Sequence, residues 1–331
     1  MGVSSAIALT PSILKVFLGM VSDKVSLLGR GQRKPYIILG LLVQAGCLFA
    51  VPYIHPGLYF RLLAFVAFVL MTGMALHDTC TDGLALDATP PQDEGAEQGI
   101  MVGGRAFSVV VISAVIGLLV QKAKRTSVFW TLGARTLLPL ALVIRVREPQ
   151  RPPERALQWS AFRAFGRWSV IALAPLGALY SLVINGANQL VNPCLESQFW
   201  IDLFAAGLYT AVWGLGAVLG GVTGGRLTDR IGHKRAALGV MAISLLSVLA
   251  LALVRGPAMA WPIVFIFGLA FGYYETVYFA TSTGFTDARI AASMFAILMA
   301  VANVGTRIGL GISARWWTPS ATAGPLSVSP F

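Results

Sequence analysis

Long apolar runs separated by short charged segments make up most of this chain. A helix that crosses the hydrocarbon core of a bilayer needs about 20 apolar residues, so each run of roughly that length predicts one membrane-spanning helix. The pattern therefore predicts an all-α membrane protein. We expect ten spans, at Val3–Val21, Tyr36–Ile54, Leu58–Asp87, Gly99–Val120, Val128–Ile144, Trp168–Leu190, Ile201–Leu227, Ala236–Val254, Trp261–Phe285 and Ile290–Ile312.

A charged hairpin between two apolar runs occurs twice. Gly19-Met-Val-Ser22-Asp23-Lys24 ends the first run, and Gly225-Arg-Leu-Thr228-Asp229-Arg230 ends the seventh. Such repetition is typical of a membrane protein built from two similar helical bundles. In each copy a glycine and basic residues follow before the next apolar run: Gly29, Arg30, Arg33 and Lys34 in the first, and Gly232, Lys234 and Arg235 in the second.

The repeat divides the chain into two pseudo-repeated transmembrane halves. We assign residues 1–147 to the N-terminal half and 168–314 to the C-terminal half. The basic, proline-containing stretch 148–167 is the predicted linker between them. The tail, residues 315–331, is rich in Thr, Ser, Pro, Ala and Gly, and we expect it to be disordered.

Composition and charge agree with a membrane location. The chain is 56% hydrophobic and only 12% charged, whereas soluble domains carry about 25% charged residues. The net charge of +11 lies in short clusters between spans, which favours a topology signal over nucleic-acid binding. With both hairpins on one side, that side and the linker hold most of the Lys and Arg residues, so we place them in the cytoplasm of a multi-pass inner-membrane protein.

No pattern of catalytic or metal-binding residues stands out. The three cysteines, Cys47, Cys80 and Cys194, lack metal-ligand spacing. The chain has no phosphate-binding loop and no nucleophile–base arrangement. We therefore expect no enzymatic activity, no cofactor and no bound metal.

Two aspartates inside the third span are candidate functional residues. Asp78 and Asp82 are four residues apart and share one helix face. A carboxylate in hydrocarbon is costly, so it needs a partner and commonly marks a pathway. Matching depths predict that Lys15 pairs with Asp78 and Arg105 with Asp82. These residues serve either proton coupling and solute binding or fixed ion pairs between helices. Asp87 is turned away from Asp82, and we expect it to make a contact at the end of the helix.

The second half offers one acid well inside a span, Glu275, which lies between Tyr274 and Tyr278. We assign it to solute or proton binding. Weaker candidates carry amide or guanidinium groups that could equally join helices: Asn185, Asn188, Gln189, Asn303 and Arg307.

These motifs resemble the major facilitator superfamily. Gly225–Arg235 fits its pattern Gly-x-x-x-Asp-[Arg/Lys]-x-Gly-[Arg/Lys]-[Arg/Lys], which lies between the second and third helices of each six-helix half. Residues 1 to about 313 are covered. The longer first hairpin and the segment His77-Asp78-x-x-x-Asp82 are similar to the branch with muropeptide permeases, folate–biopterin transporters and acetyl-CoA transporters. Arg33-Lys34-Pro35-Tyr36-Ile37 also resembles membrane proteins associated with light-harvesting and bacteriochlorophyll.

The resemblance implies a secondary active transporter in the lipid bilayer, monomeric, that moves an organic solute by alternating access together with protons. The alternatives are a non-transporting membrane assembly factor and a truncated, inactive fragment. The fragment is considered because the ten expected spans correspond to family helices 2–11 of twelve, so we expect the first and last to be missing.

The resemblance also assigns a gating role to the hairpins. Asp23 would contact the start of the tenth span near Ile290, and Asp229 the start of the fourth near Gly99, with hydrogen bonds from helix N-termini. Alternatively, the hairpins only fix topology. The glycines Gly216, Gly220 and Gly224 would form a sliding contact facing Gly99, Gly103 and Gly104. The gating set is Gly19, Asp23, Arg33, Lys34, Gly225, Asp229, Arg230, Lys234 and Arg235.

Overall fold

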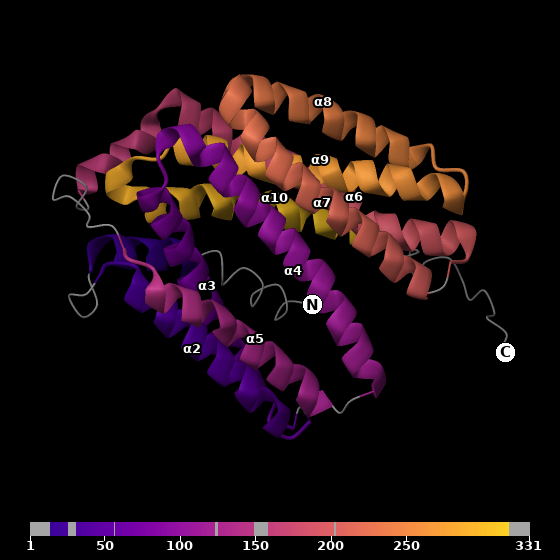
Figure 1. Cartoon of the computed structure of the whole chain (residues 1–331), viewed down its shortest axis with the longest axis horizontal. Coiled ribbons are helices and arrows are strands. Elements are labelled where there is room, and N and C mark those ends of the chain that lie inside the picture. Colours follow the sequence, from indigo (N-terminus) through magenta and orange to yellow (C-terminus); the bar gives the residue numbers. More distant parts are fainter. Residues whose placement is uncertain are drawn as a thin grey trace.

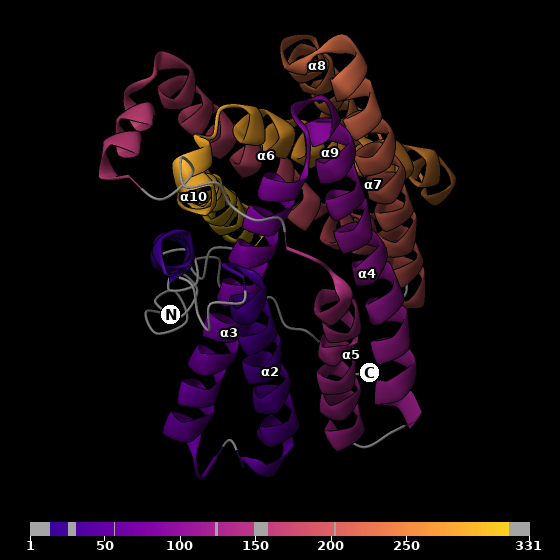
Figure 2. The ribbon, with the colours of Figure 1, turned by 60° about the vertical axis from the view of Figure 1, so that its left-hand side comes forward.

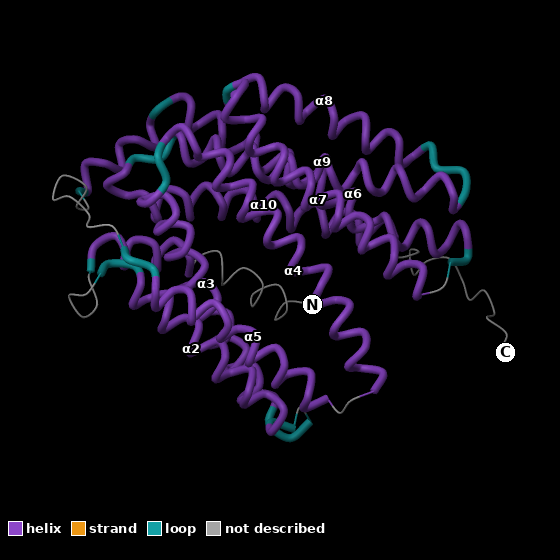
Figure 3. The backbone as a smooth tube through the Cα atoms, viewed as in Figure 1, coloured by secondary structure: helices purple, strands orange, loops and turns teal. Residues whose placement is uncertain are grey.

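The computed structural model describes residues 14–25, 31–55, 57–122, 125–148, 158–201 and 203–317, and within them all regular structure is helical (Figure 3). The first described helix covers residues 14–24. The others are α2 (Lys34–Ala50), α3 (Phe60–Ala88), α4 (Glu94–Lys122), α5 (Arg125–Arg145), α6 (Trp168–Phe199), α7 (Leu203–Ile231), α8 (His233–Ala252), α9 (Pro257–Gly284) and α10 (Ala291–Trp317), with short 3-10 helices at Val51–Tyr53, Pro91–Asp93, Trp159–Gly166 and Ala288–Ile290.

Eight of the described helices are long and apolar enough to cross a membrane. The other two predicted spans correspond to the helix of residues 14–24 and to α4, which has 29 residues. The prediction of an all-α membrane protein is therefore confirmed. The beginning of the first predicted span lies outside the described residues.

Several helix ends differ from the predicted ones. The α4 helix begins at Glu94 rather than Gly99, and α7 continues to Ile231, so Asp229 lies inside a helix. The chain leaves α7 at Gly232, whose φ of 83° is one that glycine adopts without strain. The α10 helix extends to Trp317, so the first three residues of the predicted disordered tail are helical, and 318–331 lie outside the described part.

The helices fall into two groups, with α4 reaching from one to the other (Figures 1 and 2). In the N-terminal half, α2 packs against α3 and α5. The α4 helix instead runs along α7 of the C-terminal half, and α3 meets α10. Within the C-terminal half, α9 packs between α7 and α8, and α6 packs against α10. The core is densest around α9, which is buried along most of its length.

Glycines make the α4–α7 contact close: Gly99 and Gly103 face α7 as predicted, but the glycines of α7 that face α4 are not the predicted ones. A Cβ atom added to Gly99 would lie 2.6 Å from the carbonyl oxygen of Gly221. The expected stripe on α7 faces α9 within the same half, so that prediction is wrong. Neighbouring residues on a helix are turned by about 100°, which gives α7 two glycine faces. The stripe toward α9 is Gly216, Gly220 and Gly224, while Gly214, Gly221 and Gly225 face α4; Gly103 meets Val222, and Gly104 faces open space.

Part of the predicted linker is packed onto the C-terminal half. Ala161 and Ala164 of the 3-10 helix Trp159–Gly166 are buried in a core cluster that also contains Val170 and Ile290. Residues 149–157 lie outside the described part. The last described residue before that gap, Glu148, contacts the first hairpin.

Candidate functional site

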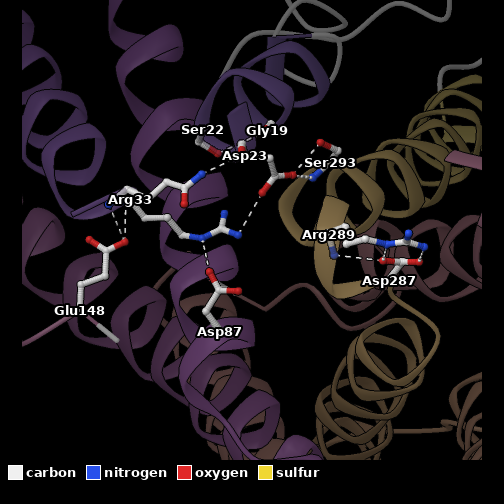
Figure 4. A network of polar contacts seen from close by, with 10 residues as sticks. Gly19, Ser22, Asp23, Arg33, Asp87, Glu148, Asp287, Arg289 and Ser293 are labelled. Atoms are coloured by element: carbon white, nitrogen blue, oxygen red, sulfur yellow. Dashed lines mark hydrogen bonds and ion pairs between the residues drawn. The ribbon is translucent and has the colours of Figure 1, made fainter. Parts of the chain in front are cut away.

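The first hairpin holds a buried ion-pair network within the N-terminal half, and Asp23 of that network also contacts the C-terminal half (Figure 4). Arg33 is fully buried. It donates to Asp23 at 3.0 Å through Nη2 and to Asp87 at 2.7 Å through Nε. The other oxygen of Asp23 accepts hydrogen bonds from the backbone N–H of Ser293, at 3.0 Å, and from its hydroxyl, at 2.7 Å.

The contact with Ser293 follows from the unsatisfied N–H groups at a helix start. The first four N–H groups of an α-helix have no partner within the helix, and its N-terminal end attracts negative charge. Ser293 is the third residue of α10. Gly19, one turn before Asp23, lets the backbones approach, because an added Cβ would lie 3.1 Å from the carbonyl oxygen of Ala292. The sequence predicts this contact near Ile290, and the structure has it three residues further on.

Glu148 fixes the start of α2 from the end of the N-terminal half. Its carboxylate accepts from the backbone N–H groups of Gln32 (2.9 Å), Arg33 (2.7 Å) and Lys34 (3.2 Å). The Lys34 ammonium donates to the carbonyl oxygens of Ile144 and Val146. Lys34, a predicted gating residue, therefore contacts the end of α5 within its own half.

The second hairpin makes the equivalent contact in the opposite direction. Asp229 accepts from the N–H groups of Gly95 and Ala96, both at 2.7 Å. These are the second and third residues of α4, and the contact lies before the predicted Gly99 because α4 begins earlier. The basic residues that follow are exposed, and within the described ranges they form no ion pairs: Arg230, Lys234 and Arg235.

A second group of charges lies deeper, between the helix of residues 14–24, α3 and α4. Lys15 forms an ion pair with Asp78. Arg105 lies 3.5 Å from Asp78 and 3.6 Å from Asp82. The two expected pairings are therefore present, and Arg105 also joins both aspartates, which the sequence did not indicate. Arg105 further packs over the ring of Phe279, 5.5 Å from its centroid.

Glu275 approaches this group from the other half. Asp78 lies ten residues before the end of α3 and Glu275 nine before the end of α9. Because both helices end at the hairpin face, both carboxylates are roughly 15 Å from it. Arg105 interacts electrostatically with Glu275. The hydroxyl of the neighbouring Tyr274 forms a hydrogen bond with the hydroxyl of Ser181, at 2.6 Å.

The turn before α10 carries its own ion pair. Asp287 accepts from the backbone N–H of Arg289 at 3.0 Å and binds its guanidinium at 2.8 Å (Figure 4). This side-chain hydrogen bond is the main reason that the pKa of Asp287 is lowered. The pair orders the backbone just ahead of Ser293. Among the described residues, no three His, Cys, Asp or Glu side chains gather as metal ligands do.

The fold is similar to those of solved transporters. The human organic anion transporter MFSD10 (TETRAN) aligns with a TM-score of 0.73 at 14% identity, over 95% of this chain and 77% of that one. FucP, a Major Facilitator Superfamily transporter in the outward conformation, aligns with a TM-score of 0.65 at 14% identity, over 96% and 89%.

Sequence relatives and the family model agree with the fold. An uncharacterized protein in the puhA-bchM intergenic region of Rhodobacter capsulatus is 26% identical over 346 residues, covering 95% of this chain and 68% of its own length. The anhydromuropeptide permease of Escherichia coli (strain K12) is 24% identical over 303 residues, covering 87% and 61%. The chain thus spans roughly two thirds of these curated relatives. The Major Facilitator Superfamily model matches residues 2–310, and the chain belongs to that family.

Proposed function

We propose that this chain is a secondary active transporter that moves an organic solute by alternating access, and that it couples this movement to protons through the charged group in its interior. Family membership supports the transporter class. The observation that carries the coupling is that three carboxylates face two cations. The carboxylates are those of Asp78, Asp82 and Glu275, and the cations are Lys15 and Arg105.

The balance of charge in this group favours the binding of one proton. When all five side chains are ionised, the group carries one negative charge. An uncompensated charge on a buried carboxylate is costly, and Asp82 is buried, so a single proton that makes the group neutral lowers that cost. Asp82 has a position suited to receiving the proton, because it shares Arg105 with Asp78, which also has Lys15. Other titratable groups nearby are His77, which bonds Gln44, and Glu97.

One helix links this group to the closed hairpin face. Asp82 and Asp87 are both on α3, five residues apart, and Asp87 binds Arg33 of the first hairpin. A change in the pairing of Asp82 would shift α3 against α4. Because Asp87 is on α3, its ion pair with Arg33 would change directly as well. Rocking of one half against the other then opens the face that the contacts of Asp23 and Asp229 close.

Reconstituted vesicles with a trapped pH indicator test the coupling. A mixture of small molecules extracted from cells is added outside the vesicles to create a solute gradient. The trapped indicator then reports protons that enter with the solutes. We expect proton movement with the unchanged chain and none above empty vesicles with Asp82→Asn, because the variant cannot bind the coupling proton. Asp93→Asn, at an exposed position of the 3-10 helix Pro91–Asp93, is the matched control and should retain it. Equal proton movement in both variants would contradict the assignment of Asp82.

A second candidate function is assembly of a membrane complex without transport. It is favoured by the first hairpin, where Arg33-Lys34-Pro35-Tyr36-Ile37 resembles light-harvesting-associated membrane proteins. The charged group would then be a fixed set of ion pairs. In that case the unchanged chain moves no protons in the vesicle experiment, and Asp82→Asn lowers only its thermal stability.

A further inference from the structure

A cavity of about 480 Å³ lies between the two halves at the hairpin face. The N-terminal half contributes the end of α3, the connection to α4 and the first residue of α4. The C-terminal half contributes the end of α9, the turn after it and the first residue of α10. A ligand in this cavity would therefore contact both halves. Its polar side chains are those of Asp87, Thr89, Glu94, Thr283 and Thr286.

The polar groups of the cavity are mostly hydrogen-bond acceptors. The hydroxyls of Thr283 and Thr286 each donate to a backbone carbonyl one turn earlier, at 2.9 and 2.7 Å. Their oxygens can then only accept, and that of Thr283 already has a long contact of 3.5 Å with Gln98. Pro90 and Pro91 have no backbone N–H to donate. The lining therefore favours a ligand that donates hydrogen bonds.

The helix ends around the cavity favour a cation over an anion. Both α3 and α9 end here, and the C-terminal end of a helix attracts positive charge. Both α4 and α10 begin here, and their N-terminal ends would attract an anion. These ends are already occupied, because Asp229 accepts from Gly95 and Ala96, and Asp23 accepts from Ser293.

Glu94 supplies a carboxylate whose charge its neighbours compensate only weakly. In the described part of the chain it accepts no hydrogen bond, and the cationic group within 4 Å of it is Nε2 of His233, at 3.9 Å, which is charged only when protonated. The carboxylate of Asp229 repels it. The side chain of Glu94 is only 15% exposed, so water screens this charge weakly. Asp87 differs, because it is paired with Arg33 (Figure 4).

We infer that this cavity binds a small alkylamine in its ammonium form, taken from the solution at the hairpin face, and that the bound cation holds the two halves together. An ammonium group has three N–H donors and no acceptor, which matches a lining of carboxylate and hydroxyl oxygens. The volume lies within the range of roughly 300–1,000 Å³ that suits organic ligands. Among the described residues, no three acidic, His or Cys side chains gather to hold a metal ion instead.

The position of the cavity predicts what the bound amine does. A ligand that contacts both halves binds tightly only while this face is closed, so it shifts the population toward the closed state. The amine should therefore slow the movement of any solute that must pass this face. This inference goes beyond the proposed function, because none of the five side chains of the proton-binding group lines the cavity.

Calorimetric titration of the purified full chain with three four-carbon probes tests the binding. Butane-1,4-diamine is a dication, butane-1,4-diol is neutral and succinate is a dianion. We expect the diamine to bind most tightly. Glu94→Gln should weaken its binding roughly tenfold or more, the effect of one hydrogen bond to a charged group. Glu196→Gln, at an exposed position on α6, is the matched control and should leave binding unchanged.

A second variant and a second measurement make the test independent of how well Glu94→Gln folds. Thr286→Val removes a hydroxyl that the C-terminal half contributes, and it should weaken diamine binding roughly 2- to 12-fold, the effect of one neutral hydrogen bond. Spin-label distances between the halves report the closed population. The diamine should raise that population in the unchanged chain and in Glu196→Gln, and raise it less in Glu94→Gln and Thr286→Val.

Four outcomes would overturn the inference. The diol, succinate or Mg²⁺ binds as tightly as the diamine; Glu94→Gln and Thr286→Val both match Glu196→Gln; the diamine binds without raising the closed population; or lipids with ethanolamine headgroups close the face in place of the free amine, when compared with choline lipids. Neither measurement uses a proton gradient. A failure here therefore leaves the test of Asp82 intact, and a failure of proton coupling leaves this result intact.

Discussion

The two hairpins share one sequence pattern and one kind of partner, yet different interactions surround their aspartates. Asp23 and Asp229 each accept hydrogen bonds from the first N–H groups of a helix in the other half. Asp23 also binds the fully buried Arg33, whereas the basic residues near Asp229 are exposed. The repeated pattern therefore places a carboxylate at a helix start, and the surroundings decide what else stabilises the contact.

Backbone distance accounts for the difference. At the second hairpin Gly225 lies so close to α4 that an added Cβ would overlap the carbonyl oxygen of Gly95. At the first hairpin an added Cβ on Gly19 would be 3.1 Å from the nearest atom of Ala292. The guanidinium of Arg33 lies against Gly83 of α3, which has no side chain to exclude it. One contact thus relies on charge and the other on close packing.

Replacement of Arg33 gives the largest expected effect. Arg33→Leu removes the buried cation that Asp23 and Asp87 share, and breaking a buried ion pair in this way costs about 3–5 kcal/mol. Arg230→Leu removes an exposed cation and should cost less than about 0.5 kcal/mol. The free energy of the closed hairpin face can be measured from spin-label distances between the halves. Similar populations of the open state in the two variants would contradict a charge-based first contact.

Much of this arrangement could be predicted from the sequence, since the apolar runs are long and the repeated hairpins share an unusual pattern. The position of Asp23 against α10 and the pairing of Lys15 with Asp78 follow from depth along helices and from the family pattern. The pairing of Lys15 with Asp78 relies on the rise of 1.5 Å per residue, which holds throughout a helix.

The remaining contacts depend on tertiary structure. Glu148 lies more than 100 residues from the N–H groups that it caps, and no local signal marks it. The glycine stripe of α7 was assigned to the wrong neighbour because two stripes exist, and periodicity does not say which faces which helix. The roles of Arg230, Lys234 and Arg235 in gating stay predictions, and the structure brings none of them to the contact.

Replacing Gly225 with alanine should have an intermediate effect. Unlike the replacement of Arg33, the substitution of glycine should cost more at the second hairpin than at the first. Gly225→Ala forces α7 away from α4, and overpacking of this kind costs about 1–3 kcal/mol. Gly19→Ala should cost less, because its nearest neighbours would have to move by only a few tenths of an ångström. Gly104→Ala is the control, since Gly104 faces open space. The same spin-label distances apply, and a Gly19 effect larger than that of Gly225 would show that close packing matters more at the first hairpin.

The smallest effect is expected at Glu148, which stabilises the first hairpin from within its own half. Glu148→Gln keeps an acceptor for the N–H groups of Arg33 and Lys34 but removes the negative charge at the start of α2. Such a charge contributes about 0.3–1 kcal/mol. Hydrogen exchange at the start of α2 should therefore accelerate by a few-fold at most, while Glu196→Gln, at an exposed position on α6, leaves it unchanged. If Glu148→Gln opened the hairpin face as far as Arg33→Leu does, the carboxylate of Glu148, and not the ion pair with Asp23, would be the main support of the first contact.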